Sequence, residues 1–479
     1  MNYRFNNGVP NQITQRASPY STLDKMKADV GIFAQDQWTL GRLTLNYGLR
    51  FEYFNAFVPA QSVAATANGW IPERTFAKVQ GVPLWKDVSP RLGGAYDLFG
   101  DGKTAIKLSI GNYVAKTGVD LTNLINPITT SVNSVTRTWT DTNANYVPDC
   151  ALGNFGANGE CGAVSDSNFG KVNINTVYAD DVTRGYGARP YNWDLLAEVQ
   201  RQLTGGMSVT AGYYRNWFGN FRATDNVLVA PGDFSPFCVT APKDSRLPQG
   251  GGYPVCGLAD VSLPKFGLVS NVVNQSSRFG RQTLVNDFLT LSVNARMSSG
   301  IRLSGGIDTG RSVADSCFVV DSPQQLLNCR VVTPFKGQTQ IKLNGSYPLP
   351  GSFVVSAIYQ NLSGPPITAS YAASNAEISP TLGRNLAACG TRLPCTSTAT
   401  VPLIVPQTMF DDRITRLDLR LSKFMNLGRR MRLQGNVDFY NAFNSSSVLS
   451  LNTTYGSRWL QPTQILDPRI MQFSAQLNF

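Results

Sequence analysis

The chain of 479 residues is 42% hydrophobic and only 15% charged, and it carries 43 glycines and a formal net charge of +11. It contains no histidine, which excludes Ser–His–Asp and Cys–His catalysis and also zinc or haem held by histidine. The lysines and arginines are scattered and mostly alternate with apolar residues, a pattern that favours a charged lumen and solvated loops over a nucleic-acid site.

The amino-terminal segment, residues 1–26, predicts partial strands and a loop. Its residues fit the end of one strand, a turn at Asn6–Pro10 and a short strand near Gln12–Arg16. The residues after Met1 form neither the basic nor the apolar region of a secretory signal. Because the rest of the chain has the features of an exported protein, we expect a further amino-terminal part outside this sequence.

Residues 27–479 predict a series of regular paired strands. In Leu43–Tyr53 every second residue is Leu, Tyr or Phe, and the residues between them are mostly polar or charged. Successive side chains of a strand point to opposite faces, so one face of this strand is apolar and the other polar. No run of about eighteen apolar residues is present, and no transmembrane helix is expected. We predict thirteen strands: Ala28–Trp38, Leu43–Tyr53, Pro90–Leu98, Thr104–Tyr113, Asn192–Leu203, Met207–Asn216, Asp287–Arg296, Ile301–Arg311, Thr339–Tyr347, Phe353–Gln360, Ile414–Phe424, Met431–Asn441 and Arg469–Phe479.

Short and long connections alternate between these strands. Segments of about twenty to nearly eighty residues separate the pairs, which is unusual within a compact soluble domain. Outer-membrane barrels have this asymmetry, with short periplasmic turns and long extracellular loops. The sequence therefore predicts an all-β fold, a transmembrane antiparallel up-and-down β-barrel with about 13–15 strands in this chain. The predicted short turns are Thr39–Arg42, Phe99–Lys103, Thr204–Gly206, Ser298–Gly300, Pro348–Gly351 and Asn426–Arg429.

The eight cysteines fall into four pairs of near neighbours, each inside one long loop and outside the predicted strands. Only the nearest-neighbour pairing keeps every bridge within its own loop. Each closed loop gains roughly 2–3 kcal/mol in the chain-entropy account, and such bonds persist in oxidising places such as the cell surface. The alternative is a metal cluster, but the chain has no CxxC motif and no histidine. The predicted disulfides are Cys150–Cys161, Cys238–Cys256, Cys317–Cys329 and Cys389–Cys395.

The first cysteine loop contains regularly spaced oxygen-bearing side chains. Asp141, Asn143, Asn145 and Asp149 match positions 1, 3, 5 and 9 of a calcium loop. The glycine of position 6 is missing and Leu152 stands where the bidentate glutamate would be, so the segment is not an EF-hand. A solvated turn rich in Asn and Asp is the alternative interpretation. Apart from this calcium ion, we expect no cofactor.

The two faces of the strands provide two sets of candidate residues. Charged residues on the polar face are candidates for the barrel lumen, or alternatively cross-strand pairs that hold the strand register. Aromatic residues on the apolar face fit lipid contact or an interface girdle. The lumen candidates are Arg50, Glu52, Lys107, Glu198, Arg296, Arg302, Asp308, Asp418, Arg420, Arg432 and Asp438. The outward aromatics are Tyr47, Phe51, Tyr213, Tyr347, Phe439 and Phe473.

Four stretches resemble the carboxy-terminal barrel of TonB-dependent outer-membrane receptors, and most of all the Oar-like group with a carboxypeptidase-regulatory-like amino-terminal domain. They are FAQDQWTLGRLTLNYGLRFEYF (33–54), SPRLGGAYDLFGDGKTAIKLSIGNYV (89–114), RPYNWDLLAEVQRQL (189–203) and VDFYNAFN (437–444). The resemblance implies a 22-stranded barrel of which residues 1–479 are the carboxy-terminal portion. It also implies a plug domain, absent from this sequence, through which the receptor couples to the TonB complex.

The resemblance implies that the chain, joined to its plug, captures a nutrient with its extracellular loops and takes it up through the lumen. The alternatives are a passive porin-like channel and a surface adhesion or interaction protein. We expect no enzymatic activity, although a site made only of carboxylates would need no histidine. The expected location is the cell outer membrane, and the expected partners are membrane lipid and an unknown small or medium ligand, with no nucleic acid. We also expect contact with the outer-membrane barrel assembly machinery through a carboxy-terminal signal formed by Phe473, Leu477 and Phe479.

Overall fold

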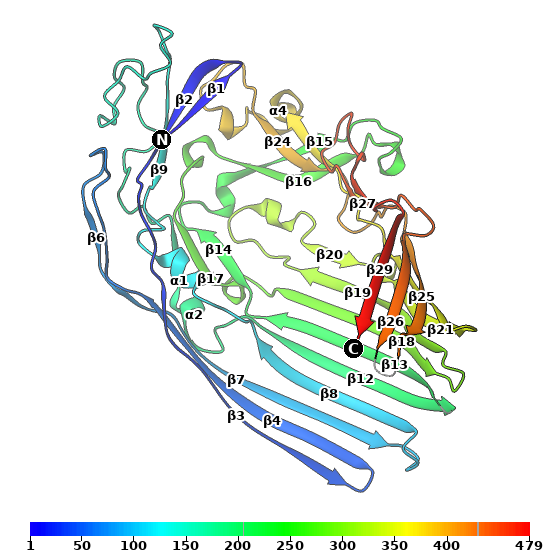
Figure 1. Cartoon of the computed structure of the whole chain (residues 1–479). Coiled ribbons are helices and arrows are strands. Elements are labelled where there is room, and N and C mark those ends of the chain that lie inside the picture. The colour runs from blue at the N-terminus through cyan, green and yellow to red at the C-terminus, as the bar shows by residue number, and fades with distance from the viewer. Residues whose placement is uncertain (205, 429–430) are drawn as a thin grey trace.

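The computed structural model describes residues 1–204, 206–428 and 431–479. Its largest element is an antiparallel sheet in which thirteen long strands follow one another in chain order (Figure 1). These strands are β3 (Lys25–Leu40), β4 (Leu43–Val58), β7 (Val79–Asp97), β8 (Thr104–Val114), β12 (Tyr191–Thr204), β13 (Met207–Gly219), β18 (Thr283–Arg296), β19 (Arg302–Asp315), β21 (Gln340–Leu349), β22 (Phe353–Leu362), β25 (Ile414–Asn426), β26 (Arg432–Tyr440) and β29 (Ile470–Asn478). Two short strands join the sheet at its long-loop end: β11 (Arg184–Tyr186) pairs with β7, and β20 (Arg330–Thr333) pairs with β19.

The predicted all-β, antiparallel, up-and-down arrangement is confirmed, because each predicted strand overlaps one of the thirteen and pairs with the next. The largest difference is in β7, which begins at Val79 rather than near Pro90. Its first part pairs with β4 and, at Leu84–Lys86, with the short parallel strand β11. The ladder with β8 starts at Arg91, so Pro90 interrupts no pairing with β8. The predicted turns Thr204–Gly206 and Asn426–Arg429 lie partly outside the described residues.

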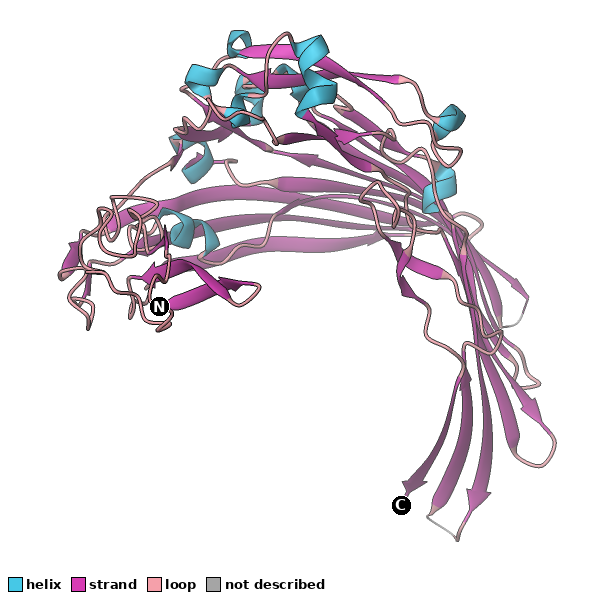
Figure 2. Cartoon of the chain, turned by 90° about the horizontal axis from the view of Figure 1, so that it is seen from above, coloured by secondary structure: helices cyan, strands magenta, loops and turns pink. Residues whose placement is uncertain are grey.

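The sheet curves into an open arc (Figure 2). Within the part of the chain that the structure describes, the edge strand β3 pairs only with β4, and the edge strand β29 pairs only with β26. Side chains that are directly paired across neighbouring strands share one face of the sheet. The continuous register from β3 to β29 therefore defines one concave inner face and one outward face. No described helix is long and apolar enough to cross a membrane.

The long connections are folded segments that gather at one end of the sheet, here called the long-loop end (Figure 1). Their strands are β5 (Gln61–Val63), β6 (Arg74–Phe76), β9 (Ser134–Thr138), β10 (Thr176–Tyr178), β14 (Arg222–Asn226), β15 (Phe234–Thr240), β16 (Pro254–Val261), β17 (Asn271–Gln275), β23 (Ser370–Ser374), β24 (Thr398–Pro402), β27 (Val448–Leu451) and β28 (Pro462–Ile465). Their helices are α1 (Asp120–Ile125), α2 (Asp180–Thr183), α3 (Phe335–Gln338) and α4 (Asn375–Leu382). Short 3-10 turns occur at Pro231–Asp233, Pro248–Gly250, Leu263–Lys265, Ser276–Arg278, Pro323–Leu326 and Ala387–Cys389.

Three of the long connections, residues 220–282, 363–413 and 441–469, share one hydrophobic core and form what we call the canopy. Phe237, Ile378 and Trp459, one from each connection, are all buried in this core. The Trp459 ring nitrogen donates a hydrogen bond to the Thr368 carbonyl oxygen at 2.9 Å. Burying side chains of this size stabilises a fold by roughly 1.5–3 kcal/mol each. The canopy is therefore a packed unit rather than three independent loops.

The amino-terminal segment contains the two predicted strands and the turn between them, but it is not part of the large sheet. β1 (Asn2–Asn6) and β2 (Val9–Arg16) form a hairpin, and β2 also pairs with β9 of a long loop. Neither strand joins the large sheet. The physical reason lies in Ile13, which is completely buried against Trp139 and Cys161 of that loop. This apolar contact holds the segment at the long-loop end.

The four disulfides join Cys150 to Cys161, Cys238 to Cys256, Cys317 to Cys329 and Cys389 to Cys395, with Cα–Cα separations of 5.9, 4.2, 4.9 and 5.4 Å. All of them lie in the long connections. The expectation that every cysteine lies outside strands is wrong for one pair. Cys238 belongs to β15 and Cys256 to β16, because this long loop is itself folded into a hairpin.

Candidate functional site

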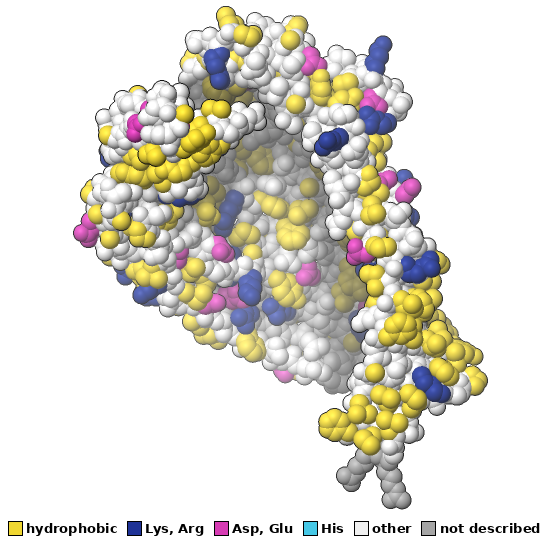
Figure 3. Space-filling model, turned by 45° about the horizontal axis from the view of Figure 1, so that its top comes forward, with side chains coloured by type: hydrophobic (Ala, Val, Ile, Leu, Met, Phe, Trp, Pro, Cys, Tyr) yellow, Lys and Arg dark blue, Asp and Glu magenta, His cyan; other side chains and the backbone are white. Residues whose placement is uncertain are grey.

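The candidate site is the inner face of the sheet. Figure 3 shows this face as a hollow in which lysine, arginine and acidic side chains are visible. The strand register places all of the sequence-derived lumen candidates on it: Arg50, Glu52, Lys107, Glu198, Arg296, Arg302, Asp308, Asp418, Arg420, Arg432 and Asp438. The alternation of polar and apolar residues along each strand produces this arrangement, since neighbouring strands keep the same face together.

At the long-loop end of the inner face, two arginines and two acids form the mouth cluster: Arg50, Glu52, Asp87 and Arg189. The Nη2 atom of Arg189 lies 2.9 Å from Asp87 Oδ2, and its Nη1 atom lies 3.4 Å from Glu52 Oε2. Arg50 Nε lies 2.6 Å from Glu52 Oε1. Arg189 and Asp87 are only 5% and 2% exposed. Because the opposite charges balance inside the cluster, each ion partly offsets the desolvation cost of its neighbour.

Aromatic residues and a long loop enclose the mouth cluster. The guanidinium carbon of Arg189 lies 5.5 Å from the centre of the Trp85 ring and 5.9 Å from that of Phe54. The Trp85 ring nitrogen donates to the carbonyl oxygen of Val182 in α2 at 2.9 Å, and Leu121 of α1 packs in the same apolar cluster. The loop between β8 and β12 therefore folds onto the inner face and covers its upper part.

Cross-strand ion pairs occupy the middle of the inner face. Lys107 Nζ lies 3.1 Å from Glu198 Oε1, and it also donates to Gln200 at 2.7 Å. A second pair joins Arg420 and Asp438 on β25 and β26. The basic side chains of both pairs are more than a third exposed, so each pair contributes about 1 kcal/mol or less. These contacts fit the alternative role of holding strand register.

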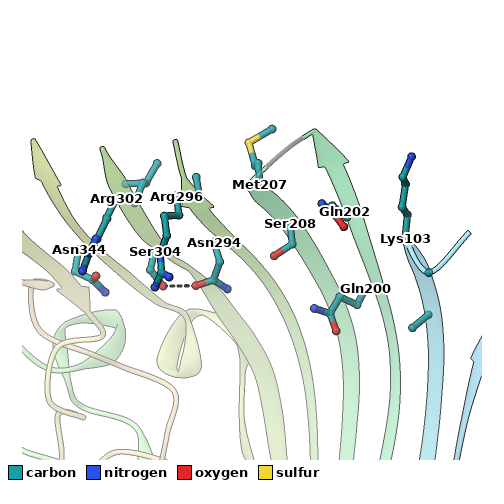
Figure 4. A pocket seen from close by; sticks show the side chains of 15 residues that line it. Lys103, Gln200, Gln202, Met207, Ser208, Asn294, Arg296, Arg302, Ser304 and Asn344 are labelled. Carbon is teal, nitrogen blue, oxygen red and sulfur yellow. Dashed lines mark hydrogen bonds between the residues drawn. The ribbon is translucent and has the colours of Figure 1, made fainter. Parts of the chain in front are cut away.

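At the opposite end of the inner face lies a polar groove of about 660 Å³, the short-turn pocket (Figure 4). Arg296 of β18 pairs directly with Arg302 of β19, and Lys103 lies on the far side of the pocket. Uncharged polar side chains such as Ser304 and Asn344 line the remainder. Among the described residues, no acid lies within ion-pair distance of these three cations. Like charges directly opposite each other are destabilising in a sheet, so holding register does not explain this pocket.

The outward face carries the six aromatics expected there: Tyr47, Phe51, Tyr213, Tyr347, Phe439 and Phe473. They alternate with the inner-face polar residues and stand among Leu, Ile and Val side chains. Phe473 and Leu477 lie on the outward side of the edge strand β29, and Phe479 follows its last residue. Their role as an assembly signal stays a prediction.

The segment proposed to hold calcium is a hydrogen-bonded turn. Asp141 accepts the backbone N–H groups of Asn145 and Tyr146 at 3.2 and 2.9 Å. Asp149 accepts the side-chain amides of Asn143 and Asn145 at 2.6 and 3.1 Å. No group of three or more His, Cys, Asp or Glu side chains converges as a metal site within the described residues. Calcium binding at this turn stays a prediction.

Glu160 fixes the same turn from the other side of the Cys150–Cys161 disulfide. Its carboxylate accepts the hydroxyl and the backbone N–H of Thr142, both at 2.6 Å, and the N–H of Asp149 at 3.2 Å. These hydrogen bonds, the Thr142 hydroxyl first, stabilise the ionised form and lower the pKa of Glu160 to about 2. The turn is thus held by an acceptor that stays charged at neutral pH.

Charged side chains in the canopy likewise form hydrogen bonds and ion pairs with neighbouring residues. The pKa of Asp244 is well below its usual range, chiefly because the Arg246 guanidinium donates to it at 2.7 Å. The hydrogen bond that Tyr371 donates to Glu377 raises the pKa of Tyr371 to about 12. Arg384 reaches between two connections to donate to Asp260 at 2.5 Å. These contacts hold the canopy in one arrangement.

Sequence reasoning missed the two most deeply buried members of the mouth cluster, Asp87 and Arg189. Asp87 and Arg189 lie in segments that were expected to be loops, just before the predicted strands that begin at Pro90 and Asn192. Continuing the alternation backwards from Pro90 would have found Asp87, since Ser89 and Asp87 fall on the polar face. Arg189 offers no such signal, because its partners come from β4 and β7.

Comparison with known structures finds membrane transporters and receptors of low sequence identity. The outer membrane transporter YddB from Escherichia coli has a TM-score of 0.49 and 11% identity, covering 94% of this chain and 54% of YddB. The siderophore receptor PiuA from Acinetobacter baumannii has a TM-score of 0.44 and 13% identity, covering 94% of this chain and 42% of PiuA. The ferripyoverdine receptor of Pseudomonas aeruginosa has a TM-score of 0.46 and 10% identity, covering 95% of this chain and 39% of that receptor. This chain thus spans about half the length of these proteins, or less.

A comparison with curated protein sequences gives no significant match. Residues 4–250, just over half of the chain, match the sequence profile described as outer membrane beta barrel domain. This match agrees with the antiparallel sheet, its polar inner face and its apolar outward face. The chain belongs to the outer membrane beta barrel domain family and is a protein of the outer membrane.

Proposed function

We propose that this chain is the carboxy-terminal barrel portion of a TonB-dependent receptor that imports a nutrient when joined to its plug. The observation that carries the proposal is the inner face, which is polar and charged from the mouth cluster to the short-turn pocket. In an outer-membrane barrel the inward side chains line the path that a solute follows. Because the sequence resembles TonB-dependent receptors, we expect that uptake along this path is energised.

The canopy supports the capture step. Three connections share one core, so they hold a fixed surface above the lumen rather than sampling many conformations. A preorganised surface loses less conformational entropy when a ligand binds. The loop that covers the mouth cluster adds a second barrier on the inner face, next to α1 and α2. A solute would meet these two layers before it reached the cross-strand ion pairs.

The short-turn pocket supports contact with an anionic group at the other end of the path. Arg296 and Arg302 repel each other and have no acid within ion-pair distance among the described residues, so an anion lowers the energy of this arrangement. The group belongs either to the passing solute or to the plug. In the part of the chain that the structure describes, β3 and β29 each have one unpaired edge, and we propose that further strands pair there to complete a 22-stranded barrel.

The proposal is tested with the full-length protein purified from outer membranes and inserted into planar bilayers. A plugged receptor conducts little at rest, and deletion of its plug-coding segment opens a large channel. The matched uptake test compares growth on a limiting nutrient in cells with and without TonB, and we expect growth to depend on both proteins. Steady conductance by the intact protein, without any need for TonB, would show a porin instead. A passive porin-like channel is the second candidate function, and the hollow of the inner face favours it (Figure 3).

A further inference from the structure

Three charged side chains interrupt the apolar outward face near the long-loop end, and we call them the outer row: Arg215, Asp287 and Arg311. Direct cross-strand pairing puts them side by side on β13, β18 and β19. Arg215 Nη1 lies 3.3 Å from Asp287 Oδ1, and Arg311 Nε lies 3.9 Å from Asp287 Oδ2. The arginine side chains are 44% and 55% exposed, whereas that of Asp287 is 18% exposed. Two guanidinium groups therefore share one carboxylate, and the row keeps a net positive charge.

The position of the outer row matches the boundary of the membrane. The outward residues of β18 below the row, Leu289, Leu291, Val293 and Ala295, are all apolar. They cover roughly 20 Å along the strand, close to the height of about 25 Å that outer-membrane barrels expose to lipid. Tyr213 lies at the upper edge of this band, and its hydroxyl donates to Asp287 at 2.6 Å. The row thus stands where headgroups begin.

A groove of about 600 Å³ lies beside the outer row, lined by residues of β12, β13 and β18 and by the segments that follow β13 and precede β18. Arg215 forms part of its wall, and the exposed Arg281 adds another cation. Tyr191 and Trp217 supply aromatic walls. The Trp217 ring stacks on that of Trp193, with centroids 6.1 Å apart and planes 8° from parallel. Such amphipathic rings are typical of the membrane–water interface.

We infer that the outer row and its groove bind the phosphate-bearing headgroup of a glycolipid in the outer leaflet. A single ion pair needs one arginine, but both Arg215 and Arg311 pair with Asp287, and Arg281 forms no ion pair among the described residues. Guanidinium groups bind phosphate through two parallel hydrogen bonds, which suits this excess. The outer row lies directly above the apolar outward residues of β18, so a molecule that occupies the row and the groove also carries acyl chains. A lipid satisfies both conditions, and a free anion satisfies only the first. This inference does not depend on transport.

The binding test uses the full-length protein in a neutral detergent, with the fluorescence of tryptophans such as Trp193 and Trp217 and native mass spectrometry as readouts. Three probes are titrated: bisphosphorylated lipid A, a phosphate-free analogue with the same acyl chains, and inorganic phosphate. We expect saturable binding of the bisphosphorylated lipid, with the phosphate-free analogue at least tenfold weaker. Equal binding of the two lipids overturns the inference. Competition by inorganic phosphate at the concentration where the lipid binds also overturns it, because the site then takes a free anion.

Two variants with opposite expected effects on lipid affinity distinguish lipid binding from a purely structural ion pair. Arg215→Gln with Arg311→Gln lowers the affinity for bisphosphorylated lipid A by about fivefold per charge removed. Asp287→Asn raises that affinity, because it frees both arginines, although it removes an ion pair. Lys423→Gln is the matched control, since Lys423 lies on the same outward face beside the short turn between β21 and β22. Unchanged affinity in the arginine variant, or weaker binding in Asp287→Asn, contradicts the inference.

Discussion

The two ends of the inner face carry the same kinds of side chain in opposite arrangements. In the mouth cluster, Arg189 is buried between Asp87 and Glu52, and positive and negative charges balance. In the short-turn pocket, Arg296 and Arg302 stand side by side and exposed, with no acid within ion-pair distance in the described residues. Buried and balanced charges hold a structure together, whereas exposed charges of one sign add nothing to its stability. The comparison therefore separates a structural end of the lumen from an end that is free to contact another molecule.

The largest effect on stability is expected when an acidic residue of the mouth cluster is replaced. Asp87→Ala leaves Arg189 buried with only the more distant Glu52 contact, at 3.4 Å, and should lower the free energy of unfolding by about 3–5 kcal/mol. Urea unfolding of the purified protein in detergent micelles measures this loss. Asp308→Ala is the control, because this inner-face acid forms no ion pair among the described residues, and a change below about 0.5 kcal/mol is expected. Equal effects of the two substitutions would remove the distinction between the two ends.

A smaller effect is expected in the middle of the inner face. Lys107→Gln removes the ion pair with Glu198, but the lysine side chain is 39% exposed and water screens the interaction. We expect a loss of about 1 kcal/mol or less in the same urea experiment. A loss as large as that of Asp87→Ala would show that exposed inner-face pairs also hold the sheet together.

In the short-turn pocket, removal of a charge should increase the stability of the protein rather than lower it. Arg302→Gln relieves the repulsion with Arg296 and should raise the free energy of unfolding by about 0.2–1 kcal/mol. If the pocket contacts an anionic group during uptake, the same variant should slow nutrient-limited growth despite its greater stability. Arg302→Lys keeps the charge and should restore growth. Lower stability in Arg302→Gln would show that the arginine is structural.

The smallest effect on stability is expected in the loop that contains Glu160, when the pH is lowered. The pKa of this group is lowered from 4.5 to about 2, so its stabilising hydrogen bonds are fully present above about pH 4.5 and disappear as the pH falls towards 2. Limited proteolysis of the 141–160 segment across this pH range, with an acid-active protease, should show increasing cleavage. In Glu160→Gln the protection should be weaker at neutral pH and nearly independent of pH. Cleavage that rises identically in both proteins would assign the effect to another group.

Local alternation was sufficient to predict the thirteen strands and the faces of residues such as Lys107 and Asp438, because a strand has a period of two and its neighbours share its register. The beginning of β7 was not predictable in this way. Gly81, Pro83 and Pro90 are typical of loops. Pro90 pairs with Leu49 of β4, whereas Gly81 and Pro83 lie at an irregularity of the same ladder, between the residues that pair with Asn55 and Phe57. The canopy and Arg189 of the mouth cluster were also missed. Both depend on contacts between segments far apart in the sequence, such as Arg189 with Glu52, for which no local pattern exists.

The central claim is that the inner face borders water and the outward face borders lipid, and labelling of strand β18 tests it most directly. Single substitutions Thr290→Cys, Ser292→Cys and Asn294→Cys place thiols on the inner face. Leu289→Cys, Leu291→Cys and Val293→Cys place thiols on the outward face. With the eight native cysteines engaged in disulfides, a water-soluble maleimide applied to isolated outer membranes should label the first three and spare the other three. Uniform labelling, or labelling of the outward set alone, would contradict the account.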